Sequence, residues 1–173
     1  MNILNKEKQH TRLGFTNLEA TEIILNLNEL LANYQVHFHK LQNFHWNVKG
    51  RDFFELHEKF EEMYTEAFKN IDAVAERIRV FGKTPISSMN DYLGLADLTE
   101  APSDLSGEFM VREILNDYEI LLSCLVETTD QAALNGDVGT IDMINGFIKK
   151  MEKNHWMLSA WLDIKQPDTE VQK

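Results

Sequence analysis

Residues 53–81 read FFELHEKFEEMYTEAFKNIDAVAERIRVF, a run that contains neither glycine nor proline. Its apolar side chains recur every three or four residues, which is the spacing of one face of an α-helix. They are Phe60, Tyr64, Ala67, Ile71, Val74, Ile78 and Phe81. Asp52 and Glu55 fit a capping box before this run, and Gly82 followed by Pro85 would end the helix. The stretch therefore predicts a long amphipathic helix that buries one face.

Three further segments carry the same helical periodicity. The first begins at Thr16, where Glu19 completes a capping box, and the last begins near Thr140. A short segment at 90–97 fits one or two helical turns within a connection that is long for neighbouring helices. With no convincing strand, the pattern predicts an all-α, ferritin-like four-helix bundle. A short extra helix would lie in the long crossover between the second and third helices.

Composition limits the class of protein. The chain has 173 residues, 43% of them hydrophobic, which suits one domain: a bundle at 16–165 between tails at 1–15 and 166–173. The single cysteine, Cys124, excludes an intrachain disulfide and favours a reducing compartment. No apolar run has the length of a signal peptide or a membrane span, so we expect a cytoplasmic protein without a membrane partner. The net charge of -11 disfavours nucleic acid as a partner of the folded body and is compatible with cations.

Two pairs of potential metal ligands lie on the helix predicted from residues 53–81. His57 and Glu61 form the first pair and Asp72 and Glu76 the second, and each pair is spaced i, i+4 on one helical face. At about 1.5 Å per residue, the pairs lie roughly 22 Å apart along the axis. A metal ligand lies within about 2–2.6 Å of its ion, so one chain cannot bring both pairs to the same ion. If they form one metal centre, the second pair comes from another copy of the chain.

All four side chains share one stripe of the helix, because steps of about 100° per residue place them within roughly 100° of one another. A two-fold axis would set Asp72 and Glu76 of an antiparallel copy against His57. Such an isologous interface would contain two equivalent sites. The alternative is a solvated acidic face on which Glu76 pairs with Arg77 or Arg79.

His45 continues the apolar spacing of the first helix and falls near the same short loop as His57. Imidazoles combined with carboxylates suit iron, zinc or manganese. The alternative for each histidine is a core residue whose ring bonds a backbone carbonyl or a neighbouring side chain. The E-x-x-H sequence from Glu152 to His155 is a separate case. Di-iron carboxylate bundles need two such motifs and this chain has one, so we interpret His155 as core packing.

Three motifs at their mutual spacing resemble those of the Dps family, the mini-ferritins also called DNA-binding proteins from starved cells. They are FHWNVKG at 44–50, FFELHEKFEE at 53–62 and DAVAERI at 72–78. The resemblance covers nearly the whole chain and implies a homo-oligomer, a hollow dodecamer of four-helix subunits. It also implies a ferroxidase that oxidises Fe(II), commonly with hydrogen peroxide. The ferric mineral would be stored inside the shell, which protects against oxidative stress.

The resemblance further implies roles for individual residues. One subunit would contribute His45 and His57 to the ferroxidase centre as catalytic iron ligands. A two-fold-related subunit would contribute Asp72 and Glu76. Glu61 stands where the family often has aspartate, and we expect it to join the iron ligands. Mineral would nucleate at three glutamates: Glu58, Glu61 and Glu62. Iron-entry pores would be lined by aspartates near the start of the fourth helix: Asp142, Asp130 and Asp137.

DNA binding is the alternative function, as an architectural protein with an incidental metal site. In many members of the family a lysine-rich tail binds DNA. Here residues 1–15 offer Lys6, Lys8 and Arg12 against Glu7. Three basic residues could still add up over twelve copies, and the protein would then associate with the nucleoid. We expect iron oxidation to be the main function.

Overall fold

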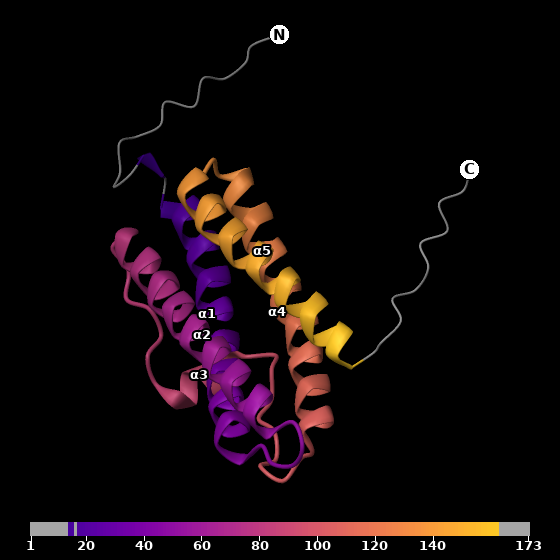
Figure 1. The fold of residues 1–173 in the computed structure, drawn as a ribbon. Coiled ribbons are helices and arrows are strands. Elements are labelled where there is room, and N and C mark those ends of the chain that lie inside the picture. Colours follow the sequence, from indigo (N-terminus) through magenta and orange to yellow (C-terminus); the bar gives the residue numbers. More distant parts are fainter. Residues whose placement is uncertain (1–13, 16, 163–173) are drawn as a thin grey trace, which may run out of the picture.

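The computed structural model describes residues 14–15 and 17–162, and this part of the chain forms five α-helices and no strand. The helices are α1 (Asn17–Asn47), α2 (Phe53–Val80), α3 (Met89–Leu95), α4 (Gly107–Leu134) and α5 (Val138–Trp161). Four of them are long and lie side by side as a bundle, while α3 is the short helix of the crossover (Figure 1). The predicted all-α four-helix fold is confirmed.

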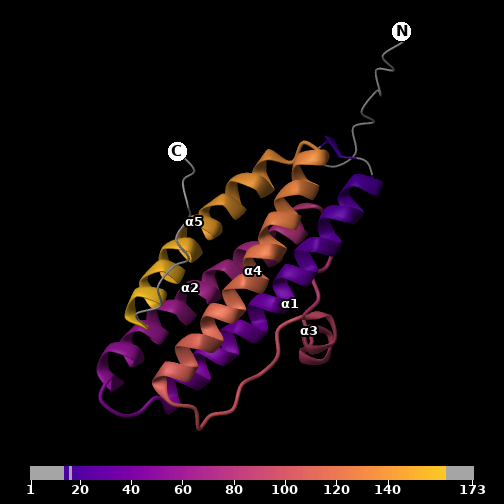
Figure 2. The ribbon, with the colours of Figure 1, turned by 90° about the vertical axis from the view of Figure 1, so that its right-hand side faces the viewer.

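The bundle consists of two antiparallel hairpins, α1 with α2 and α4 with α5. The connection between them carries α3, which packs on α1, and it returns the chain along the bundle to the start of α4 (Figure 2). The closest contacts join α1 to α2, α1 to α4 and α4 to α5. Helices α2 and α5 approach each other less closely, and a groove lies between them on that side of the bundle.

The apolar faces predicted from the sequence form the core. On α2, Phe60, Val74 and Ile78 are fully buried, and on α1 the same holds for Leu27 and Leu41. The rings of Phe44 and Phe60, which come from α1 and α2, lie 6.0 Å apart between centroids. Burial of this apolar surface is the main force that holds the two hairpins together.

The end of α2 at Gly82 agrees with the prediction from the sequence, whereas its start at Asp52 does not. Gly82 has φ +80, and its N–H donates to the carbonyl of Arg79, so this glycine closes α2 in the left-handed conformation that ends many helices. Asp52 stands at the N-cap position of α2, but its side chain makes no capping hydrogen bond. The predicted capping box with Glu55 is therefore wrong. Its counterpart at Thr16 lies outside the described residues.

The start of α5 also differs from the prediction. The helix begins at Val138 rather than Thr140, because the side chain of Asp137 accepts a hydrogen bond from the backbone N–H of Thr140 and acts as the N-cap. Serines cap the other two late helices: Ser88 at α3 and Ser106 at α4. Each of these polar side chains satisfies an amide that the first helical turn leaves unpaired.

The predicted tails, 1–15 and 166–173, fall almost wholly outside the described residues. Phe15 is the exception, since its ring packs edge-on against Phe81 with 5.5 Å between centroids. The last residue of the predicted N-terminal tail is thus part of the packed body. Within the described part of the chain, no helix combines the length and the apolar character that crossing a membrane requires.

Candidate metal centre

His45 and His57 hold each other through reciprocal hydrogen bonds. The Nδ1 atom of His45 lies 2.8 Å from the backbone carbonyl oxygen of His57, and the Nδ1 atom of His57 lies 2.8 Å from the carbonyl oxygen of His45. The first histidine lies in the last turn of α1 and the second in the first turns of α2. The short connection at 48–52 brings these turns together, with Gly50 at φ +104.

These bonds fix the orientation of both rings. A carbonyl oxygen can only accept, so each Nδ1 carries a proton and donates it in the hydrogen bond, and Nε2 is the ring nitrogen left to bind a metal. Metal-binding histidines commonly use a carbonyl in this way to fix the ring and its tautomer. The rings stack with 3.8 Å between centroids and 19° between planes, which holds them parallel and close together.

Aromatic neighbours support the stacked pair. The ring of Phe53 stacks on His57 at 5.0 Å, and the edge of Tyr64 meets His45 at 5.3 Å. His45 is buried, at 8% exposure, while His57 is half-buried, so the pair sits at the surface rather than deep in the core. The two Nε2 atoms are therefore preorganised, and an ion can reach them from solvent.

Glu61 completes a group of three donors, as the sequence spacing predicts. Ligand atoms of His45, His57 and Glu61 all lie within 4.8 Å of one another. Glu61 follows His57 by one turn of α2, and its carboxylate is exposed. Two imidazoles and one carboxylate suit iron, zinc or manganese. Three protein ligands leave further coordination positions open for a substrate or for other ligands.

Asp72 and Glu76 lie apart from this group, as the length of α2 requires. Both are exposed, and neither enters an ion pair or a donor cluster within the described residues. The arginines that could have neutralised Glu76 bond elsewhere: Arg77 to Asp137, and Arg79 to the carbonyl of Lys83 and the hydroxyl of Thr84. The simple alternative, in which a neighbouring arginine pairs with Glu76, is thus not what the structure contains.

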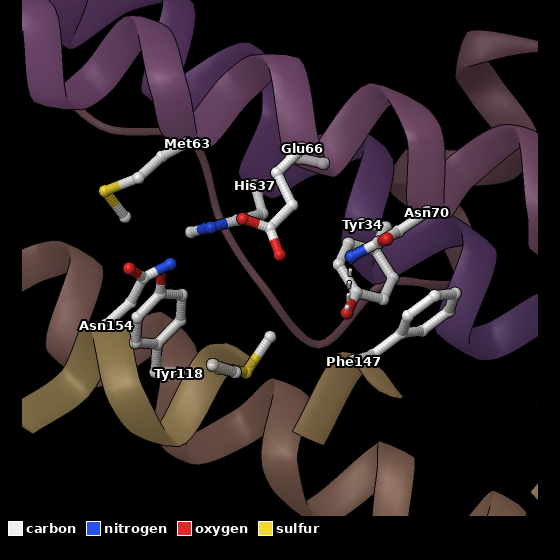
Figure 3. A pocket seen from close by; sticks show the side chains of 10 residues that line it. Tyr34, His37, Met63, Glu66, Asn70, Tyr118, Phe147 and Asn154 are labelled. Atoms are coloured by element: carbon white, nitrogen blue, oxygen red, sulfur yellow. Dashed lines mark hydrogen bonds between the residues drawn. The ribbon is translucent and has the colours of Figure 1, made fainter. Parts of the chain in front are cut away.

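The centre of the bundle does not offer a competing di-iron site. A cavity of about 20 Å³ lies between the four long helices, with room for about one water molecule (Figure 3). Its polar lining consists of Tyr34, His37, Glu66, Asn70, Tyr118 and Asn154. Glu66 is the one carboxylate in this lining, whereas a bundle-centre di-iron site uses four. Neither Glu152 nor His155 lines the cavity, so the E-x-x-H sequence supplies no ligand to it. Glu152 is exposed and His155 is half-buried, so His155 is not the fully buried core residue that the sequence suggested.

Comparisons with known proteins show the family to which the chain belongs. Residues 24–166 match the ferritin-like domain family. DNA protection during starvation protein 2 of Bacillus anthracis is 43% identical over 142 residues, which are 82% of this chain and 97% of the relative. The Dps structure from Vibrio cholerae O1, a ferritin-like diiron-carboxylate superfamily member, has a TM-score of 0.85 at 36% identity, with 88% of this chain and 96% of that chain covered. The chain belongs to the Dps family of ferritin-like proteins. A Dps protein from Bacillus brevis gives a TM-score of 0.82 at 40% identity, with coverages of 85% and 99%.

The acidic groove of this Dps chain lies between α2 and α5, next to the candidate centre. It has a volume of about 520 Å³, and three glutamates of α2 line it: Glu61, Glu62 and Glu66. Three lysines moderate their charge. Lys69 and Lys150 line the groove as well, Lys150 lies 3.4 Å from Glu66, and Lys59 bonds Glu62 at 3.0 Å. Glu58, the other predicted nucleation residue, is exposed but does not line the groove. Glu66 lines the groove instead, and its spacing of four residues from Glu62 on one helical face was the available signal.

The predicted pore aspartates of this Dps chain have different surroundings. Asp130 and Asp142 are exposed near the end of α4 and the start of α5. Asp137 is 1% exposed, and its carboxylate accepts hydrogen bonds from Thr140 and from the guanidinium of Arg77. Because that charge already caps α5 and ties it to α2, the expectation that Asp137 lines a pore is withdrawn.

Sequence analysis missed a buried charged network that joins α1 to α4. Asp117 accepts from Nζ of Lys40 at 2.5 Å and lies 2.8 Å from Nδ1 of His37. All three residues are at most 4% exposed. Because buried charges are costly unless paired, these contacts must be satisfied together, and they fix one alignment of the two helices.

Proposed function

We propose that this Dps chain is an iron-sequestering ferroxidase whose centre is shared between two-fold-related subunits. His45, His57 and Glu61 of one subunit bind Fe(II) as substrate, and Asp72 and Glu76 of the facing subunit complete the set. The observation that carries the proposal is the reciprocal bonding of His45 and His57, which fixes two imidazoles, each with its Nδ1 engaged, beside Glu61.

The surface around the candidate centre supports a metal centre that is shared between two subunits. Phe68 is 60% exposed and lies on the same stripe of α2, about midway between the two ligand pairs. Trp46, which follows His45 in the sequence, is 68% exposed. Phe54, three residues before His57, is 80% exposed. Large apolar side chains gathered around polar groups are typical of a surface that another chain covers. An antiparallel copy of α2 covers them and brings its own Asp72 and Glu76 to the histidines.

The proposed oxidant is hydrogen peroxide. One peroxide molecule accepts one electron from each of two Fe(II) ions as its O–O bond breaks, and hydrolysis of the resulting Fe(III) to mineral releases protons to water. The protein contributes imidazole nitrogens as ligands, and carboxylates whose charge favours Fe(III) over Fe(II). Ferric product then moves to the adjoining groove, where Glu61, Glu62 and Glu66 collect it and start the mineral.

The same proposal extends to the assembly. Twelve subunits enclose the mineral, with the groove between α2 and α5 facing the interior. Asp142 and Asp130, both exposed at one end of the bundle, line the pores through which Fe(II) enters. Carboxylates at a pore attract divalent cations and raise their local concentration.

Two variants test whether the centre is shared. His57→Ala removes a ligand from one half and Asp72→Ala from the other, and each is expected to slow Fe(II) oxidation at least about tenfold. His39→Ala, which removes an exposed histidine of α1 outside the site, is the matched control and should keep the wild-type rate. Full-rate oxidation by His57→Ala or Asp72→Ala would overturn the assignment.

Mixing the two variants makes the test sharper. When they are co-expressed in equal amounts, about half of the two-fold pairs contain one subunit of each kind. In such a mixed pair, one site has both halves damaged and the other has both halves intact. The mixture should therefore recover about one quarter of the wild-type rate. A centre built within one subunit would recover nothing, since every chain lacks a ligand.

DNA protection is a second candidate function, because several relatives carry that name, among them the Bacillus anthracis and Brevibacillus brevis proteins. The net charge of -11 opposes it, and the basic residues at 1–15 lie outside the described residues. A gel shift at physiological salt, with the full chain and with a chain lacking residues 1–15, is the measurement. DNA that the full chain leaves unshifted excludes this function.

A further inference from the structure

A second cluster of metal-ligating side chains lies far from the ferroxidase centre. Ligand atoms of Glu29, Asp97 and Cys124 all lie within 4.8 Å of one another. Among the described residues, only this group and the group around His45 have three such donors in reach of one ion. Glu29 and His45 are separated by about 24 Å along α1, so the two groups are independent.

The three donors come from three separate segments. Glu29 lies on α1, Asp97 follows α3 in the crossover, and Cys124 lies near the middle of α4. Their side chains converge on a groove of about 400 Å³. Cys124 is 8% exposed with its sulfur toward this groove, while Asp97 is exposed, so an ion can enter from solvent and reach the buried thiol.

One fully buried residue, Asn33, fixes all three segments. Its side-chain Nδ2 donates to the backbone carbonyl of Glu29 at 3.1 Å and to Sγ of Cys124 at 3.6 Å. Its Oδ1 accepts from the backbone N–H of Asp97 at 2.9 Å and from that of Leu98 at 3.0 Å. Amide donors to sulfur and rigid support behind the ligands are what metal sites use to orient their donors. The donor set is thus held in place by the protein interior.

The charges around this group favour a cation. Burial, together with the nearby carboxylates of Asp97 and Glu127, raises the pKa of Glu29. Glu119 and Glu127 also line the groove, and no basic side chain lines it with them. The side-chain hydrogen bond between Glu29 and Asp97 also raises this pKa, and a divalent cation that takes its place would relieve the repulsion among these carboxylates.

We propose that Glu29, Asp97 and Cys124 bind a borderline divalent cation of the Zn²⁺ class, at a site distinct from the ferroxidase centre. Mixed thiolate and carboxylate donors select such ions, whereas Mg²⁺ and Ca²⁺ take oxygen ligands only. On binding, the Cys124 thiol loses its proton to the solvent and the sulfur bonds the metal. Affinity therefore rises with pH.

Co²⁺ is the probe, because its bond to a thiolate gives a charge-transfer absorption band in the near ultraviolet. The chain contains one cysteine, so this band can come only from Cys124, whatever the ferroxidase centre binds. Titration of the full-length oligomer with Co²⁺ at pH 8 should produce the band, and added Zn²⁺ should remove it by competition. If excess Co²⁺ produces no band, the proposal is wrong, and the proposed ferroxidase function is unaffected.

Variants then identify the ligands. Cys124→Ser should abolish the band, and Glu29→Gln and Asp97→Asn should each weaken Co²⁺ binding at this site at least about tenfold. Glu119→Gln is the matched control, since it removes the same charge from the same groove without removing a ligand. Circular dichroism establishes that each variant is folded. Unchanged Co²⁺ affinity in both Glu29→Gln and Asp97→Asn would reduce the site to a lone thiol and overturn the proposal.

Discussion

Phe68 offers a direct test of the proposed pairing of two subunits. Its ring is 60% exposed on α2, on the same stripe as His57 and Asp72. Among the aromatic contacts of the described residues, it has one, with the ring of Phe38 at 6.3 Å between centroids and tilted by 42°. In the proposed pair, the two-fold axis brings His57 of each subunit to Asp72 of the other. Such an axis crosses α2 midway between these two residues, next to Phe68. The two copies of this ring therefore lie together at the middle of the proposed interface.

The exposed area gives the size of the effect. A phenylalanine side chain offers about 200 Å². Burying the exposed 60% of it removes roughly 120 Å² from water, worth about 3 kcal/mol at 25 cal/mol per Å². Each interface contains the residue twice, so Phe68→Ala should weaken the pair by at least about 3 kcal/mol. That corresponds to about a hundredfold increase in the dissociation constant.

Sedimentation velocity over a concentration series, with the rate of Fe(II) oxidation measured on the same samples, tests this expectation. Phe68→Ala should release smaller species at low concentration, and oxidation should fall with the fraction of intact pairs. Phe109→Ala is the matched control, because it removes the same side chain at the same 60% exposure from α4. The control should keep the ferroxidase rate. If Phe68→Ala keeps both the mass and the rate of the wild type at every concentration, α2 does not pair in this way.

Two further expectations concern buried groups. Asp117→Asn removes the nearer of two carboxylates beside the buried Nζ of Lys40 and leaves only Glu113, at 3.9 Å, so we expect guanidinium unfolding to report a loss of about 3 kcal/mol, the lower end of the range for a broken buried ion pair. The double variant Lys40→Met, Asp117→Asn removes both charges and should regain most of the lost free energy of unfolding. A loss below about 1 kcal/mol in the single variant Asp117→Asn would contradict the pairing of Lys40 with Asp117. Burial, and then the carboxylates of Glu29, Asp97 and Glu127, raises the pKa of Cys124 from 9.0 to about 11. The rate of thiol labelling of the metal-free protein should thus rise about tenfold per pH unit up to pH 10. A labelling rate that stops rising at about pH 9 would refute the raised pKa of Cys124. The folded state holds this proton more tightly than the unfolded chain, so the thiol's contribution to stability is complete below pH 9 and is lost as the pH rises through 11.

The long helices could be predicted because their signals are local. The spacing of Phe60, Val74 and Ile78 is a property of one segment, and all three are buried in the structure. The position of His57 one turn before Glu61 is local too, which is why the donor group around them was predicted. The capping box at Asp52 failed although its residue types fit. A capping residue usually has an extended backbone, whereas Asp52 has φ -93 and ψ 15, and its residue type does not reveal these angles.

Contacts between distant segments could not be predicted in the same way. Glu29, Asp97 and Cys124 meet only because the crossover packs on α1, and the crossover has no periodicity that would reveal its path. Asp137 is an aspartate near the start of the last helix, as expected of a pore residue, but it is buried and forms an ion pair with Arg77 of α2. In each case the side chain's role depends on which element covers it.

The reciprocal bond between His45 and His57 changes how the two sequence interpretations relate. A histidine bonded to a backbone carbonyl and a histidine that binds a metal were treated as alternatives, yet each ring here has two nitrogens with separate partners. Nδ1 donates its hydrogen to the carbonyl, which leaves Nε2 as the nitrogen that can bind a metal and fixes its direction. The bond that would satisfy a core histidine is thus the bond that prepares a ligand. Because each histidine holds the other through the main chain of the opposite helix, the α1–α2 hairpin and half of the proposed iron centre form together as the chain folds.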